Sequence, residues 1–226
     1  MIARGPVLLA SLLLIAGCAS TANRVMPGYG RMNVSTSRLG VILIKKNIQV
    51  LNADDAERDL GKGGPETAFY DFFGAEFPEA MKRSSKFQTV SFAAYADEEL
   101  LQSQEHDAVP FDNGGLRSAI PSRRGFISDS LPYLCIIDYL SIGHERNMNT
   151  PVGGGSDGNF TGFFSGAESL TATANFVMWD NRKGTVAAYG TIGERVRIFD
   201  AMTKAVWVDL LKKMARAVAD GMPYAR

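Results

Sequence analysis

The chain has 226 residues, of which 46% are hydrophobic and 21% are charged, and this composition is typical of one globular domain. Its 24 basic and 24 acidic side chains balance, and the sequence has no basic tract or acidic tail, which argues against a nucleic-acid partner. The two cysteines and two histidines are scattered, so we expect no metal site and no cofactor.

The N-terminus has the three parts of a secretory signal. Arg4 supplies a positive charge, an apolar run of 11 residues follows from Val7, and small residues lead to Cys18. The run is too short for a membrane-spanning helix, which needs about 20 apolar residues. The last four residues, Ile15-Ala16-Gly17-Cys18, resemble the lipobox of bacterial lipoproteins. That resemblance implies cleavage after Gly17 and attachment of lipid, palmitate included, to Cys18. The alternative is an ordinary signal peptide that contains a cysteine by chance.

Cleavage would remove 17 of the 226 residues, leaving 209, and would remove one base, so that the net charge becomes about −1. Residue 19 is Ala rather than Asp. By resemblance to enterobacterial sorting rules, this favours the outer membrane, facing the periplasm, over the inner membrane or the cell surface. Cys135 is then the one cysteine without lipid, and its apolar neighbours favour a buried side chain over a reactive thiol.

The folded domain is expected to follow a tether. Residues 18–37 show no hydrophobic periodicity, which predicts a flexible, lipid-bearing segment. Residues 38–222 are predicted to form one periplasmic α/β domain. Its first strand is expected at Leu39–Val50, where four apolar residues are consecutive. A polar loop with several glycines is expected at 52–64.

Helical signals follow this loop. Pro65 and Glu66 are typical of a helix start, and apolar residues then recur at helical spacing. Pro78 predicts a kink or a restart, because proline removes a backbone donor, and Gly74 four residues earlier eases the steric clash. The aromatic residues of this helix are predicted to pack on a sheet rather than to form a partner groove: Phe69, Tyr70, Phe72, Phe73 and Phe77.

The centre of the sequence alternates strands with long irregular stretches. Strands are predicted at Lys86–Phe92 and Tyr133–Ile142, which contain many branched and aromatic residues. A short helix is expected at Ala96–Gln104. Two stretches, at about 96–130 and 144–168, are rich in glycine and polar residues and are predicted to be loop insertions.

The C-terminal part has the clearest pattern. Apolar and polar residues alternate through 169–199, and the Asp180–Gly184 turn, which ends in glycine, indicates a long hairpin. Asp200 is the expected N-cap of a last helix that ends near Gly221. Together the elements predict an α/β (α+β) fold: a single mixed, largely antiparallel sheet of about five strands with two main helices packed on it.

This order of elements, in a lipoprotein, resembles a group of periplasmic domains that includes LpoB, the periplasmic part of CsgG and the N-terminal domain of TolB. The likeness covers roughly 39–220 and lies mainly in three stretches, Phe77–Val90, Leu134–Gly143 and Phe176–Val186. It implies an accessory role in the cell envelope. One member of the group forms a pore, which is not expected here, because the insertions lack the alternating apolar face of a membrane strand.

Catalytic motifs are weak in this sequence. The segment Gly154-Gly155-Ser156-Asp157-Gly158 matches the G-x-S-x-G pattern of serine hydrolases, but it lacks the strand before it and the helix after it that this pattern requires. His144 and Glu145 are suited in principle to acid–base work, and His106 is the other histidine. We therefore assign no catalytic residue.

Two other features have alternative interpretations. Asp138 lies in an apolar strand and needs a partner, for which Arg195 or Arg197 is the expected residue. Three aromatic residues lie among glycines without periodicity: Phe160, Phe163 and Phe164. They form either an interaction surface or membrane contact, or a cap that folds back on the sheet.

Three functions are consistent with these patterns. The leading hypothesis is a non-enzymatic, membrane-anchored lipoprotein whose periplasmic domain binds another envelope protein during envelope assembly or secretion. The second is a ligand-binding or hydrolytic domain that uses the 105–168 loops with His144, Glu145 and Ser156. The third is an oligomeric component of an outer-membrane secretion assembly. The sequence leaves the partner and the oligomeric state open.

Overall fold

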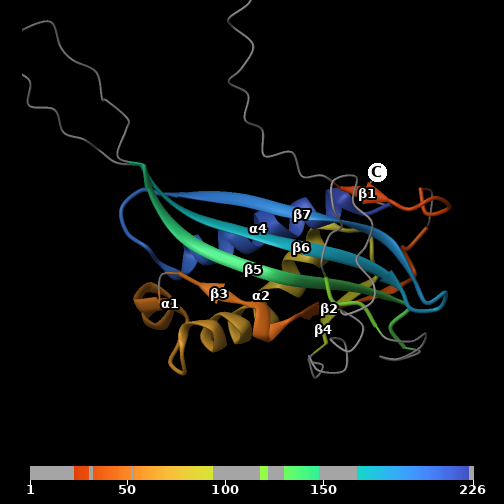
Figure 1. Cartoon of the computed structure of the whole chain (residues 1–226), viewed down its shortest axis with the longest axis horizontal. Helices are drawn as coiled ribbons and strands as arrows, with labels where there is room; N and C mark the ends of the chain where they lie inside the picture. Colours follow the sequence, from red (N-terminus) through yellow and green to blue (C-terminus); the bar gives the residue numbers. More distant parts are fainter. Residues whose placement is uncertain are drawn as a thin grey trace, which may run out of the picture.

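One mixed sheet carries the helices on one of its faces (Figure 1). The computed structural model describes residues 23–30, 33–51, 53–93, 118–121, 130–147 and 167–223. Its strands are β1 (Arg24–Val25), β2 (Arg38–Leu43), β3 (Gln49–Val50), β4 (Thr89–Phe92), β5 (Tyr133–Asn147), β6 (Ala167–Asp180) and β7 (Thr185–Ile198). Its helices are α1 (Ala53–Leu60), α2 (Pro65–Ser84) and α4 (Lys204–Gly221), with one 3₁₀ turn, η1 (Lys45–Asn47).

The strand order is β1-β7-β6-β5-β2-β4, and β3 pairs with β5 beyond the end of β2. The neighbours β5, β6, β7 and β1 are antiparallel, whereas β2, β3 and β4 join through parallel pairs. The predicted fold class is therefore confirmed. The described part of the sheet has seven strands rather than about five, because β1 and β3 are two residues long and leave no periodic pattern in the sequence.

The main core lies between the sheet and the helices. In β6 the even-numbered residues from Leu170 to Met178 are buried in this core, which is the alternation that a strand with one face on helices requires. On α2 the rings of Phe73 and Phe77 stack with centroids 4.3 Å apart, and Phe69 lies 6.0 Å from Trp207 of α4. Each such buried side chain contributes about 1.5–3 kcal/mol.

The predictions for α2 are largely confirmed. Pro65 is at its first turn, and four of the five predicted core aromatics are buried, while Tyr70 is half-buried and packs edge-on against Phe92. The helix continues through Pro78 without a restart. Gly74 allows close packing, since a Cβ there would lie 2.9 Å from the ring of Phe92.

The predicted loop at 52–64 is wrong, because it contains α1. This helix buries only Ala56 in full, so its sequence has no apolar stripe to reveal it. Tertiary contacts hold it instead. Arg58 donates a hydrogen bond to the carbonyl of Met202, which precedes α4, and Trp207 Nε1 of α4 donates one to Asp59 at 3.3 Å.

The predicted tether also differs from the structure. Residues 23–30 and 33–37 belong to the folded body, where Arg24 and Val25 pair with β7. Tyr29 is 4% exposed and Val34 is 1% exposed, and both lie in the main core. Hydrophobic periodicity did not reveal these contacts, because the segment runs along the edge of the sheet and only isolated side chains, such as Tyr29 and Val34, enter the core. Only four residues, 19–22, therefore separate Cys18 from the first described residue of this body, Asn23, instead of about 20.

Other boundaries shift for local reasons. The single strand predicted at Leu39–Val50 is interrupted by η1. Helix α4 has Thr203 at its N-cap instead of Asp200. The insertion predicted at 144–168 is shorter than expected, because β5 extends to Asn147 and β6 begins at Ala167. The helix predicted at Ala96–Gln104 lies outside the described residues.

Candidate functional site on the open face of the sheet

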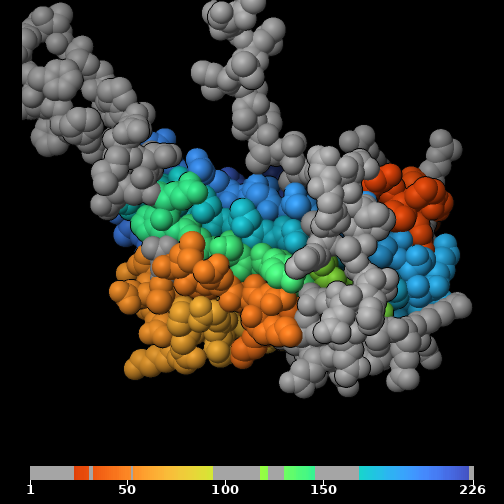
Figure 2. Space-filling view, viewed as in Figure 1, coloured from red at the N-terminus to blue at the C-terminus, as the bar shows by residue number. Residues whose placement is uncertain are grey.

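The sheet face away from the helices, called the open face here, has two halves. Towards the β6–β7 turn it is apolar and forms a second buried cluster, whose strand members are Ile42, Leu134, Ile136, Val177, Trp179 and Tyr189; Ile44, just after β2, belongs to it as well. Towards the other end the same face is polar. The space-filling view shows β5, β6 and β7 uncovered side by side over that second half (Figure 2).

The polar half consists of short cross-strand rows from β5, β6 and β7: Ser141–Thr173–Gly193, Gly143–Thr171–Arg195 and Glu145–Ser169–Arg197. These side chains are small or charged. Thr171 Oγ1 donates a hydrogen bond to the carbonyl of Gly143 at 3.0 Å, and Arg195 pairs with Glu145 at 2.5 Å. The result is a surface of hydroxyl, backbone and charged groups, which is suited to hydrogen bonding with a second surface.

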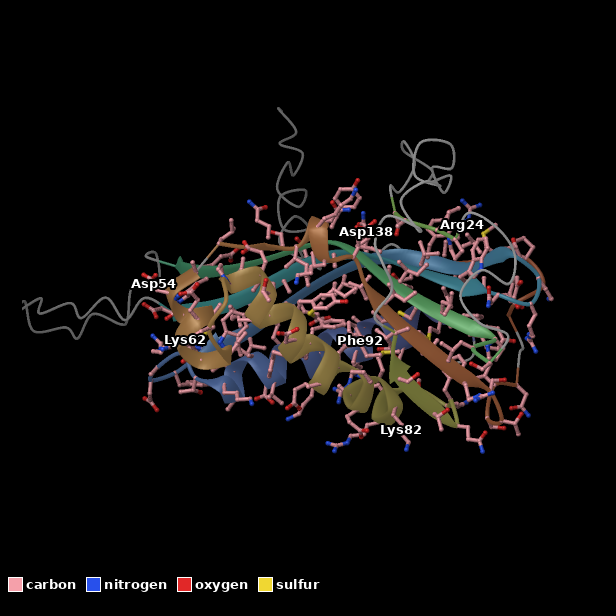
Figure 3. All side chains as sticks on the ribbon, turned by 90° about the horizontal axis from the view of Figure 1, so that it is seen from below. Arg24, Asp54, Lys62, Lys82, Phe92 and Asp138 are labelled. Atoms are coloured by element: carbon pink, nitrogen blue, oxygen red, sulfur yellow. The ribbon has the colours of Figure 1, made fainter. Side chains whose placement is uncertain are left out.

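Asp138 marks the border between the two halves (Figure 3). Its side chain is 0% exposed, and the pairing of β5 with β6 shifts register just after it. Oδ1 accepts hydrogen bonds from Asn47 Nδ2 and from the Tyr139 amide, both at 2.8 Å, and Oδ2 accepts one from the Ala119 amide at 2.7 Å. This carboxylate therefore joins η1, the bulge of β5 and the segment 118–121.

The residue after Asp138 is strained. Tyr139 has φ of 50°, in the left-handed region that a residue with a Cβ rarely adopts, and its side chain is 44% exposed. The hydrogen bond that the Tyr139 amide donates to the Asp138 carboxylate holds this backbone conformation in place. Strained backbone of this kind concentrates at binding sites, where surrounding contacts hold it in place. Leu51, 62% exposed, lies beside Gly143 on the same face.

The predicted pairing of Asp138 with Arg195 or Arg197 is wrong. The register aligns Asp138 with Asn175 and Thr191, whereas Arg195 aligns with Gly143, five residues further along β5. Because β5 bulges after Asp138, this is four residues on β6 and β7, and at about 3.3 Å per residue the separation is about 13 Å. Sequence reasoning identified the need for a partner but not its identity, because the donors belong to η1 and to the segment 118–121.

His144 and Glu145 do not act on one site. Successive residues of a strand point to opposite faces, so Glu145 is on the open face and His144 is on the helix side. There His144 Nδ1 lies 3.7 Å from Asp55 Oδ2, and Nε2 lies 3.2 Å from Glu168 Oε2. The two carboxylates face opposite edges of the imidazole ring, so no single ion can be bound by all three residues. Within the described residues no group of three potential metal ligands was found.

Cys135 is fully buried, and burial raises the pKa of its thiol to about 12. The predicted buried side chain is confirmed, and this cysteine stays protonated and unreactive at neutral pH. The remaining predicted residues lie outside the described residues: Gly17, Cys18, His106, Ser156, Phe160, Phe163 and Phe164.

Sequence reasoning missed a second buried carboxylate, Asp180, in the predicted β6–β7 turn. It is 0% exposed and accepts hydrogen bonds from the amides of Arg182 and Lys183 and from the Tyr29 hydroxyl at 3.3 Å. Burial, and then the charge of Asp180, raise the pKa of Tyr29 to about 12. Gly184 closes the turn with φ of 63°, as its position in the sequence predicts.

No family model and no curated protein matches this chain. Among solved structures it is similar to the PelC dodecamer of Paraburkholderia phytofirmans, at 13% identity and a TM-score of 0.36, over 86% of this chain and 96% of that chain. A single-residue variant of that PelC gives 12% identity and a TM-score of 0.38, over 88% and 98%. A neuraminyllactose-binding hemagglutinin homolog from Helicobacter pylori gives 11% identity and a TM-score of 0.33, over 83% and 86%. All three TM-scores are below 0.5, so these are loose likenesses.

No helix in the described parts of the chain is both long and apolar enough to cross a membrane.

Proposed function

We propose that this protein is a lipid-anchored bacterial lipoprotein of the outer membrane, facing the periplasm, that acts without catalysis. Its open face would bind another cell-envelope protein during envelope assembly or secretion. The anchoring rests on the sequence Ile15-Ala16-Gly17-Cys18, and the resemblance to the LpoB, CsgG and TolB domains belongs to the same proposal. The observation that carries the binding role is the polar half of the open face, bordered by the strained Tyr139.

Three features of this face suit a protein partner. It extends over three neighbouring strands, which is the kind of broad surface that protein partners bind. Its hydroxyl and charged groups supply directional hydrogen bonds. Tyr139 and Leu51 add exposed apolar area at its margin, and tyrosine is enriched among residues that dominate binding energy.

Lipid attachment is tested first and separately. Cells that express the chain with a C-terminal tag are labelled with radioactive palmitate, and the purified protein is analysed for label. We expect label in the natural chain and none in a Cys18→Ser variant. Equal label in both, or none in either, would overturn the anchoring proposal.

Partner binding is tested by crosslinking in cells. A photo-reactive amino acid replaces Thr173, which is exposed on β6, the middle of the three strands of the open face. The matched control places it at Asp71, which is exposed on α2 on the helix side. We expect one dominant crosslinked protein from position 173 that is missing from position 71. Crosslinks of equal strength at both positions would contradict a specific role for the open face.

A further inference from the structure

One end of the domain carries a concentration of positive charge. Three chain segments meet where β6 turns into β7: the start of β2, the join between α2 and β4, and the turn itself. Six exposed basic side chains, called the basic end here, belong to these segments: Arg38, Lys82, Arg83, Lys86, Arg182 and Lys183.

Direct contacts bring the three segments together. The Tyr133 ring lies 5.7 Å from Phe87, which follows Lys86, and 4.7 Å from the Arg182 guanidinium. The amide of Gln88 donates a hydrogen bond to the carbonyl of Ser37, next to Arg38, at 3.0 Å. The six charges therefore belong to one continuous surface and not to separate patches.

Few described carboxylates offset this charge. Asp180 is fully buried and offsets one of the six charges, because its Oδ1 lies 3.5 Å from Arg182 Nε; it also accepts hydrogen bonds from Tyr29 and from amides of the turn. Glu79 lies one helical turn before Arg83 on α2. By contrast, α1 at the other end contains four acidic residues and one base, and Figure 3 shows Asp54 and Lys62 at that end, with Lys82 in the other half. The excess of basic side chains at the basic end thus contrasts with the excess of acidic side chains on α1.

The chain leaves the folded body close to the basic end. Asn23 is fixed beside Gly190 of β7 and Gly221 of α4, and Arg24 pairs with Tyr189. From Tyr189 to Thr185, the first residue after the turn, is about 13 Å along the strand. Asn23 is the fifth residue after Cys18, so a fully extended chain separates the two residues by at most about 17 Å. A lipid on Cys18 thus keeps the β6–β7 turn within a few nanometres of the bilayer surface.

We propose that the basic end docks on the anionic headgroups of the membrane that holds the Cys18 lipid. This inference rests on the proposed lipid anchor. Lysine and arginine beside an anionic leaflet strengthen binding, and an acyl anchor combined with a basic patch gives both retention and a defined orientation. The acidic α1 end is then directed away from the membrane, and the open face stands beside it, accessible to a partner.

The test uses a lipid-free chain, so that it does not depend on lipidation. The chain from residue 18 onward with Cys18→Ser keeps the whole folded body, which begins at Asn23. Its sedimentation is measured with vesicles of phosphatidylcholine alone and of an equal mixture with phosphatidylglycerol. We expect binding to the anionic vesicles only, and weaker binding as salt is raised.

The variant Lys82→Gln with Lys86→Gln removes two exposed charges of the basic end. Each basic group near an anionic surface strengthens binding about fivefold, so we expect about 25-fold weaker binding for this double variant. The matched control, Lys62→Gln with Lys212→Gln, removes two exposed charges elsewhere and is expected to bind within about twofold of the parent. Circular dichroism checks that both variants are folded.

Three outcomes would overturn the proposal: no preference for anionic vesicles, equal weakening in the two double variants, or binding to a soluble polyanion such as polyphosphate without binding to vesicles. The last outcome would assign the basic end to a soluble polymer. Because palmitate labelling tests Cys18 independently, loss of label with intact vesicle binding would reject the anchor alone.

Discussion

Replacing Asp138 with alanine removes the shared acceptor of three hydrogen bonds. The donors are Asn47 Nδ2 and the amides of Tyr139 and Ala119, at 2.7–2.8 Å. A buried donor left without an acceptor costs about 1–3 kcal/mol. Asn47 is half-buried and can turn to water, but Ala119 is 0% exposed. We expect Asp138→Ala to lower the free energy of unfolding by about 3–5 kcal/mol, a large share of the about 5–15 kcal/mol typical of a domain.

Two further variants separate the contributions. Asp138→Asn keeps Oδ1 for Asn47 and Tyr139 but turns an amide N–H towards the Ala119 amide, so we expect a loss of about 1–3 kcal/mol. Asn47→Ala removes one donor and leaves the carboxylate with two, and is expected to cost about 1 kcal/mol. The expected order of destabilisation is therefore Asp138→Ala, then Asp138→Asn, then Asn47→Ala.

Urea unfolding of the lipid-free chain, followed by fluorescence of the buried Trp179 and Trp207, gives these free energies. Amide hydrogen exchange at Ala119 reports the local contact, and exchange there should accelerate in both Asp138 variants before the rest of the sheet opens. The reasoning is refuted if Asp138→Ala costs less than about 1 kcal/mol, or if Asp138→Asn is as costly as Asp138→Ala.

Three other predictions follow from buried contacts. Gly190→Ala places a Cβ against the Asn23 side chain, so the N-terminal segment should detach; trypsin should then cut after Arg24 faster than in the parent chain, and an unchanged rate would contradict the contact. Cys135, with a pKa of about 12, should not react with a thiol reagent at pH 8 until urea unfolds the chain; reaction of the folded chain would show that the thiol is accessible. The pKa of Tyr29 is about 12 in the folded chain and about 10 when the chain is unfolded, so the contribution of Tyr29 to the free energy of unfolding is complete below pH 10 and is lost as pH rises towards 12. A Tyr29→Phe variant should therefore lose less stability between pH 10 and 12 than the parent chain. An equal loss in both would assign the effect to other tyrosines.

Sequence patterns by themselves determined the elements with strong local signals. The alternation through β6 and β7, the Asp180–Gly184 turn and the aromatic repeat of α2 each carry their signal within a few residues, and the structure confirms them. The burial of Cys135 followed from its apolar neighbours. These features depend on which side chains face the core, and periodicity encodes that directly.

Tertiary structure alone decided the features that join distant segments. The partners of Asp138 come from residues 47 and 119, which no local pattern relates to it. Helix α1 is held by hydrogen bonds with α4 and the residue Met202 before it rather than by an apolar stripe, and the N-terminal segment is held by single contacts with β7 and the core. Positive charge gathers at the basic end because three chain segments that are distant in the sequence meet there. Such features depend on contacts between residues that are distant in the sequence, and local sequence patterns contain no signal for these contacts.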